Sequence, residues 1–233
     1  YFDVVLNVDY INVAVNQLST TITSRGMLGY NETDQQQGYG ITYEGESLLF
    51  DAGFMIGISS SRVSDNVRGT DPQFTDEDFV SMENVHTVSP GISDLDTKGK
   101  FNDNAAGSNK LDIFVNHSSY AWSNAPFDQF VILKYVIYNQ SGGNLDNLHC
   151  GIFADWDIMD YNLNKAEYDQ DLKLGYAYST ESNGLYGGIQ LLSNTNPNYY
   201  AFNNDGTGGS FDIYDGFSES EKFTSLSNEL NQI

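Results

Sequence analysis

Short apolar stretches separated by turn-forming residues are the feature that most constrains the fold of this chain. Clusters of Gly, Asn and Asp recur about every ten residues, a spacing typical of strands joined by turns. They include GTDP (69–72), NDNAAGSN (102–109), SGGN (141–144) and NNDGTGG (203–209). Successive strands without helical patterns between them favour antiparallel pairing over βαβ units. The sequence therefore predicts an all-β fold, an antiparallel, jelly-roll-like β-sandwich.

Alternating apolar residues and short apolar runs predict the individual strands. In residues 1–15 the alternation places Val4, Leu6, Val8 and Tyr10 on one face. The run FVILKYVIY (130–138) is apolar on both faces, which predicts a central strand. Further strands are expected at 39–43, 47–58, 79–88, 111–117, 128–139, 148–158, 172–179, 184–192 and 199–202.

One segment near the C-terminus departs from the strand pattern. In SESEKFTSLSNEL (218–230), Ser218 is followed three residues later by Glu221, which is the capping-box pattern of a helix start. Phe223, Leu226 and Leu230 then fall on one helical face. One short C-terminal helix is therefore expected. Because no repeat or low-complexity linker divides the chain, we expect a single domain over residues 1–233, as a fragment of a larger secreted protein.

The charge balance narrows the range of partners. Ten Lys and Arg residues stand against 32 Asp and Glu, a formal net charge of −22. Nucleic acid and anionic membrane surfaces need local clusters of cations, which this sequence lacks, so both are unlikely partners. No apolar run reaches the length of about 18 residues needed to span a membrane, and no signal peptide is recognisable. Cations are therefore the expected ligands of so acidic a chain.

The segment GIFADWDI (151–158) suggests a metal site. Strand alternation places Asp155 and Asp157 on one face, about 6.5 to 7 Å apart, with no cationic residue beside them in sequence. Ca²⁺ would offset the repulsion between these carboxylates, and oxygen atoms of the following loop would complete its coordination shell. A solvated acidic face and a catalytic carboxylate pair are the alternatives. The predicted calcium loop consists of Asp155, Asp157, Asn162, Asn164 and Asp169.

Two further acidic segments are weaker candidates. Residues 203–215 carry Asp205, Asp212 and Asp215 among glycines, which suits either a metal or an ordinary turn. The segment DPQFTDEDF (71–79) has no regular spacing, and solvation of its charges explains it adequately.

Catalytic motifs are missing from the sequence. It contains no GxSxG, HExxH, Walker or CxxC pattern. Cys150 is the only cysteine, so no intramolecular disulfide forms, and we expect its side chain to be buried beside Ile152. Trp156 alternates onto the apolar face of its strand, where core packing is expected rather than sugar binding. The chain is therefore not expected to be an enzyme.

Several longer strings resemble a known family region. They are LLFDAGFMIGISSSRVSDNVRG (48–69), DQFVILKYVIYNQSGGNLDNLHCGIFADWDI (128–158), NGLYGGIQLL (183–192) and DGFSESEKFTSLSN (215–228). Together they resemble the non-catalytic region that follows the protease domain in secreted subtilisin-like serine peptidases exported by type IX secretion. This resemblance implies a secreted or cell-surface accessory module that contacts other domains of its parent or a cell-surface protein. It also implies that Asp155 and Asp157 are the positions that supply oxygen ligands to a metal ion.

Two other function classes remain open at this point. The first is a carbohydrate-binding or glycoside-hydrolase-type sandwich, which an exposed row of Tyr or Trp would favour. The second is a structural subunit of a cell-surface assembly, which an unpaired apolar strand edge in residues 1–15 would favour.

Overall fold

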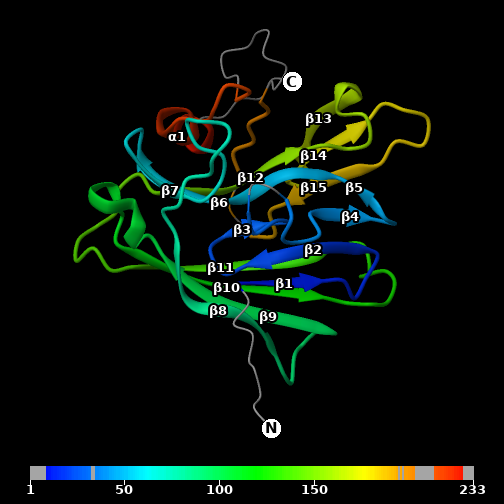
Figure 1. The fold of residues 1–233 in the computed structure, drawn as a ribbon, viewed down its shortest axis with the longest axis horizontal. Helices are drawn as coiled ribbons and strands as arrows, with labels where there is room; N and C mark the ends of the chain where they lie inside the picture. The colour runs from blue at the N-terminus through cyan, green and yellow to red at the C-terminus, as the bar shows by residue number, and fades with distance from the viewer. Residues whose placement is uncertain (1–8, 33–34, 194, 196, 203–212, 228–233) are drawn as a thin grey trace.

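The computed structural model describes residues 9–32, 35–193, 195, 197–202 and 213–227. Two antiparallel sheets, of eight and four strands, pack face to face, while a small third sheet and a C-terminal helix lie beyond the first (Figure 1). This arrangement confirms the predicted antiparallel sandwich with one short C-terminal helix. In the described parts of the chain, no helix combines the length and the apolar character that crossing a membrane requires.

The eight-stranded sheet is the centre of the fold, with the order β12-β6-β3-β2-β4-β5, β1 beside β2 and β7 beside β6. Its strands are β1 (Tyr10–Val13), β2 (Leu18–Thr23), β3 (Met27–Leu28), β4 (Ile41–Tyr43), β5 (Glu46–Ser47), β6 (Leu49–Ser59), β7 (Arg62–Asp65) and β12 (His149–Trp156).

The other two sheets are smaller. The four-stranded sheet has the order β11-β10-β9-β8, and the three-stranded sheet has the order β13-β14-β15. The strands of the former are β8 (Val80–Val88), β9 (Leu95–Asn102), β10 (Ile113–Ala121) and β11 (Val131–Asn139). Those of the latter are β13 (Asn164–Asp169), β14 (Leu174–Ser179) and β15 (Tyr186–Gln190). The helical elements are η1 (Asn104–Asn109), η2 (Tyr161–Leu163) and α1 (Glu219–Ser227).

The strand β6 contributes to the core on both of its faces. Phe54 and Ile56 pack against Phe79 and Phe101 between the two main sheets. Met55 points the other way and belongs to a second cluster with Phe217, against which Leu226 of α1 packs. A strand buried on both faces reads as a near-continuous apolar run, and this is why residues 49–59 are so apolar.

Several sequence predictions are corrected by the fold. No strand forms at 199–202. The strand β11, expected to be central, is the edge of its sheet; its outer apolar face carries Tyr138, which stacks on Phe114 with ring centroids 4.4 Å apart. Cys150 is exposed, because it lies near the start of the edge strand β12. Val4, Leu6, Val8 and Leu230 lie outside the described residues.

Candidate metal centre

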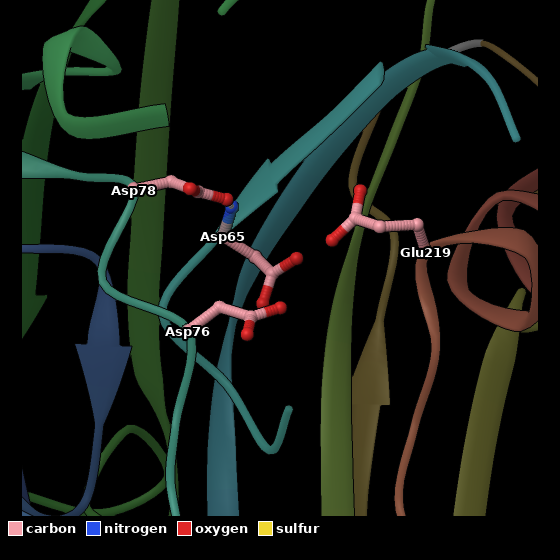
Figure 2. Close-up of side chains that lie close together, drawn as sticks. All are labelled: Asp65, Asp76, Asp78 and Glu219. Carbon is pink, nitrogen blue, oxygen red and sulfur yellow. Dashed lines mark hydrogen bonds between the residues drawn. The ribbon is translucent and has the colours of Figure 1, made fainter. Parts of the chain in front are cut away.

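Four carboxylates from three separate segments converge between the central sheet and α1. Asp65 ends β7, Asp76 and Asp78 lie in the segment before β8, and Glu219 is the first residue of α1. One oxygen from each lies within 4.8 Å of the oxygens of the other three (Figure 2). We refer to Asp65, Asp76, Asp78 and Glu219 as the carboxylate cluster.

Backbone pairing brings the first three members together. The strand β7 pairs with β6, which sets Asp65 opposite Met55. The N–H of Asp65 donates to Oδ2 of Asp78 at 3.2 Å, and the N–H of Asp78 donates back to the carbonyl of Asp65 at 3.2 Å. The N–H of Asp76 donates to the carbonyl of Val67 at 2.9 Å. The acidic segment is thus held against β7 by its own backbone.

The start of α1 supplies the fourth carboxylate. The hydroxyl and the N–H of Ser218 both donate to Oε2 of Glu221, at 2.6 and 2.9 Å, so the Glu221 half of the predicted capping box is present. Glu219 therefore occupies the first turn, where the positive end of the helix dipole favours a carboxylate. Its Oε2 accepts from the N–H of Val63 at 3.2 Å, which ties the helix to β7.

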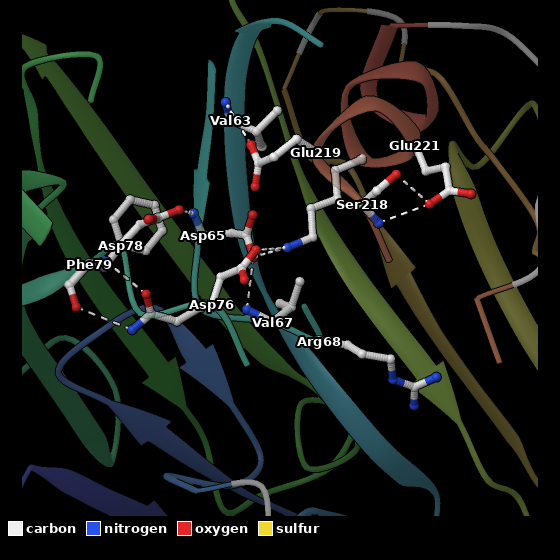
Figure 3. Close-up of polar contacts among 12 residues, drawn as sticks. Val63, Asp65, Val67, Arg68, Asp76, Asp78, Phe79, Ser218, Glu219 and Glu221 are labelled. Atoms are coloured by element: carbon white, nitrogen blue, oxygen red, sulfur yellow. Dashed lines mark hydrogen bonds and ion pairs between the residues drawn. The ribbon is translucent and has the colours of Figure 1, made fainter. Parts of the chain in front are cut away.

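Lys222 is the cation of this cluster; its two partners, Asp65 and Asp76, are labelled in Figure 3. Its side chain is fully buried, and its Nζ donates to Oδ1 of Asp65 at 2.7 Å and to Oδ2 of Asp76 at 2.6 Å. One ammonium group against four ionised carboxylates leaves three negative charges uncompensated by lysine. Like charges at this spacing, one of them buried and three half-buried, are costly unless protons or a further cation neutralise them.

Among the residues that the structure describes, one oxygen at the centre of the cluster finds no hydrogen-bond partner. Oδ1 of Asp65 accepts from Lys222 and from the N–H of Val67, but Oδ2 of the same carboxylate is buried and unpartnered. The Asp65 side chain is fully inaccessible to solvent. An unpaired buried carboxylate oxygen loses its hydration without compensation. The position therefore has an unmet need for a proton donor or a cation.

The same crowding shifts the proton affinities of the cluster. Burial raises the pKa of Asp65 and of Asp78 to about 6, and that of Glu219 to about 7. The pKa of Lys222 is also raised, because the attraction of Asp65 and Asp76 outweighs the lowering effect of burial. Lys222 thus stays charged, and the carboxylates compete for protons near neutral pH.

These pKa shifts predict that, without metal, Glu219 lowers the stability of the folded chain more as pH rises. The pKa of Glu219 rises from 4.5 to about 7 on folding, so between those values the folded chain holds more protons and its stability falls as pH rises. We expect Glu219→Gln to gain melting temperature relative to the parent chain as pH rises from 5 to 8 in chelator. Thermal melts of both chains test this. A constant difference across that range would contradict the shift.

The predicted calcium loop has a different environment. Asp155 does have an adjacent cation, since Nη2 of Arg68 donates to its Oδ2 at 2.5 Å; the premise of an unpaired carboxylate is therefore wrong for this residue. The side chain of Asn164 accepts from the N–H of Ile158 and donates to its carbonyl oxygen. The side-chain amide of Asn162 donates to Oδ1 of Asp160.

The last two members of that loop also have identifiable surroundings. Asp169 caps a turn by accepting from the N–H of Leu172 at 2.9 Å. The pKa of Asp157 is raised by burial and by the charge of Asp155. Calcium binding at this loop stays a sequence prediction, and Asp157→Asn serves below to distinguish the loop from the carboxylate cluster as the position of the ion.

The carboxylate cluster lies largely outside the sequence-based candidates. Solvation was the expected explanation for 71–79, yet Asp76 and Asp78 of that segment face Asp65 and Lys222, so the interpretation is corrected for these two residues. Of the glycine-rich segment 203–215, Asp205 and Asp212 lie outside the described residues, and Asp215 is exposed. Asp65 and Lys222 were missed because their partners lie far away in sequence.

Comparisons with known proteins give no relative from which a role could be transferred. No family model, no curated protein and no solved structure matches this chain. The functional argument therefore rests on the geometry of the sites.

Proposed function

We propose that this chain is a non-catalytic interaction domain whose C-terminal helix is held onto the central sheet by Ca²⁺ at the carboxylate cluster. The observation that carries the proposal is the convergence of four carboxylates around the unpartnered Oδ2 of Asp65. A divalent cation would bring the cluster and Lys222 from a net charge of −3 to −1. Proton loss from carboxylates with raised pKa values would accompany binding.

The donor set and its size support Ca²⁺ over other divalent ions. All four side chains offer oxygen, whereas Zn²⁺ sites usually include His or Cys. Ca²⁺–oxygen distances of about 2.3 to 2.6 Å place opposite ligands about 4.6 to 5.2 Å apart, but Mg²⁺ would require about 4.0 to 4.2 Å. Mg²⁺ is usually bound through only one or two carboxylates, whereas four converge here, and their oxygens, which lie within 4.8 Å of one another, can accommodate the spacing of a Ca²⁺ site.

We further propose that the domain acts outside the cell as an accessory region of a secreted subtilisin-like peptidase. The support is the set of sequence strings at 48–69, 128–158, 183–192 and 215–228. Its partners would be other domains of that protein or a cell-surface protein. A site of modest affinity would suffice there, since extracellular Ca²⁺ modules work with dissociation constants of about 0.1 to 1 mM.

Thermal melting of the full chain with Ca²⁺ or with chelator tests the proposed function. A ligand at a hundredfold excess over its dissociation constant stabilises the folded state by about 2.7 kcal/mol. For a chain of this size, that corresponds to a rise in melting temperature of about 5 to 10 °C. We expect this rise at pH 8 and a much smaller one at pH 5, where protons occupy the carboxylates.

Two variants separate the carboxylate cluster from the predicted calcium loop. Glu219→Gln preserves an acceptor for the N–H of Val63 but removes the charge, and it should abolish most of the Ca²⁺ response. Asp157→Asn makes the matching change in the loop and should leave the response intact. Identical melting curves with Ca²⁺ and with chelator would overturn the proposal. A response lost only in Asp157→Asn would move the ion to the loop.

A further inference from the structure

The three-stranded sheet has an aromatic face that the carboxylate cluster does not involve. Tyr176 and Tyr178 are two residues apart on β14, and the register pairs Tyr178 with Tyr186 on β15. All three therefore lie on one face of the sheet. We call Tyr176, Tyr178 and Tyr186 the tyrosine face. Their ring centroids are 5.2 to 6.2 Å apart, and their planes lie within 36° of one another.

The opposite face of this sheet is the one that packs inward. Ala177 of β14 is buried with Leu48 and Ile158. Gly187 of β15 is so close to Trp156 that an added Cβ would lie 2.7 Å from the indole ring. The tyrosine face is therefore turned away from the core, and Tyr186 is 65% exposed. One exposed aromatic ring beside two half-buried rings on the same sheet is an arrangement that binding surfaces use.

A hollow of about 330 Å³ lies beside the rings. Gly188 supplies room for it, because a Cβ at this position would lie 2.8 Å from Cβ of Tyr176 and 2.8 Å from the carbonyl oxygen of Gly175. The hollow combines apolar walls with one carboxylate, a composition suited to a ligand with both apolar and hydroxyl surfaces. It is lined by Asp169, Leu174, Tyr176, Tyr186, Gly187 and Gly188.

Glu167 fixes two of the tyrosine rings. The hydroxyl of Tyr176 donates to its Oε2 at 2.6 Å, and the hydroxyl of Tyr178 donates to its Oε1 at 2.9 Å. These two bonds lower the pKa of Glu167, so the carboxylate stays ionised and keeps both phenols in place. A platform held in advance loses less side-chain entropy when a ligand binds.

We propose that the tyrosine face binds a neutral polysaccharide, with a sugar ring stacked on Tyr186 and sugar hydroxyl groups reaching Asp169 in the hollow. The C–H groups of a pyranose carry partial positive charge and suit the negative faces of aromatic rings. The carboxylates of Glu167 and Asp169 repel anionic ligands, as does the net charge of −22. This site is independent of the proposed Ca²⁺ ion.

A cationic ligand fits the same observations less well. Aromatic sites for ammonium groups surround the cation with ring faces, but these three rings are within 36° of parallel, and Tyr178 and Tyr186 stack on each other instead of enclosing a space. Both oxygens of Glu167 are already taken by phenols. Lys165 lies directly opposite Tyr178 in the register and adds a positive charge beside the face.

Affinity electrophoresis of the full chain in native gels tests the proposal. The gels contain barley β-glucan, xyloglucan, galactomannan or soluble starch, with polygalacturonate and poly-lysine in parallel. We expect at least one neutral polysaccharide to retard the chain. Tyr186→Ala should weaken that binding about tenfold or more, as expected for loss of a central aromatic contact. Tyr186→Phe keeps the ring and should bind like the parent.

Two measurements keep this test decisive. Tyr214→Ala removes a tyrosine of similar exposure, 61%, next to α1 and should leave binding unchanged. Thermal melts of each variant establish that it is folded. Retardation by none of the four neutral polysaccharides, retardation by poly-lysine or polygalacturonate alone, or a folded Tyr186→Ala chain that binds like the parent would each overturn the proposal. Failure of the Ca²⁺ experiments would leave this result untouched.

Discussion

Lys222→Met is expected to lower the free energy of unfolding by about 3 to 5 kcal/mol at pH 8 in the presence of chelator. Removing one partner of a buried ion pair leaves the other as an uncompensated charge, and losses of about this size follow. Here Asp65 and Asp76 would both lose their ammonium donor, and the Asp65 side chain has no access to water. Urea denaturation of both chains measures the difference.

A second substitution separates lost packing from lost charge pairing. Adding Asp65→Asn to Lys222→Met removes the stranded charge, so the double variant should be more stable than Lys222→Met alone. The Ca²⁺ response should grow in Lys222→Met, because a cation then relieves one more negative charge. A loss below about 1 kcal/mol, the usual value of an exposed pair, would contradict the burial of this lysine.

Arg68→Met is expected to cost a similar amount, about 3 to 5 kcal/mol. Arg68 donates to Asp155 at 2.5 Å and to the carbonyl of Ile213 at 3.3 Å, and its side chain is only 9% exposed. Burial already raises the pKa of Asp51 to about 6, while the charge of Arg68 lowers it. Loss of the guanidinium would therefore leave two carboxylates without their cation. Urea denaturation at pH 8 measures this loss.

An exposed ion pair of the same chain serves as the control. Lys110 pairs with Asp112 at 2.6 Å, but both side chains are about 40% exposed. Lys110→Met should change the free energy of unfolding by no more than about 1 kcal/mol. Equal effects of Arg68→Met and Lys110→Met would mean that burial does not set the strength of these pairs.

Local sequence signals predicted the features that local physics determines. The side chain of Glu221 accepts from the N–H of Ser218 as the capping box predicts, because this contact needs only residues within one turn. The alternation of Ile152 and Ala154 onto the core-facing side of β12 is also confirmed, since strand geometry fixes it. Trp156 packs against the same cluster although the register shifts between Asp155 and Trp156. Several strands escaped prediction because their sequences are polar, including β2 (LSTTIT), β7 (RVSD) and β9 (LDTKGKFN).

Polar strands are tolerated in this core because their buried hydroxyl groups find hydrogen-bond partners. Thr97 of β9 and Ser119 of β10 are fully or almost fully buried, and their side-chain oxygens lie 2.6 Å apart. A buried hydroxyl pair of this kind satisfies itself. Alternation of apolar residues cannot reveal such a strand, because the pairing appears only after the neighbouring strand is placed.

The carboxylate cluster could not be predicted for a related reason. Lys222 lies 157 residues after Asp65, and Asp155 lies 87 residues after Arg68. Each acidic segment considered alone looked like a solvated or repulsive group of charges. Only the fold brings one buried cation to each of them, and only the fold shows that the lysine leaves Oδ2 of Asp65 unpartnered.

Calorimetric titration of the full chain with CaCl₂ at pH 8 tests the central claim most directly. We predict saturable binding of one Ca²⁺ per chain, loss of that binding in Glu219→Gln, and unchanged binding in Asp157→Asn. Repeating the titration at pH 6.5 in buffers of different ionisation enthalpy should show proton release, because the pKa values of Asp78 and Glu219 are raised to about 6 and 7. Absence of binding, or equal affinity in the parent and in Glu219→Gln, would contradict the account.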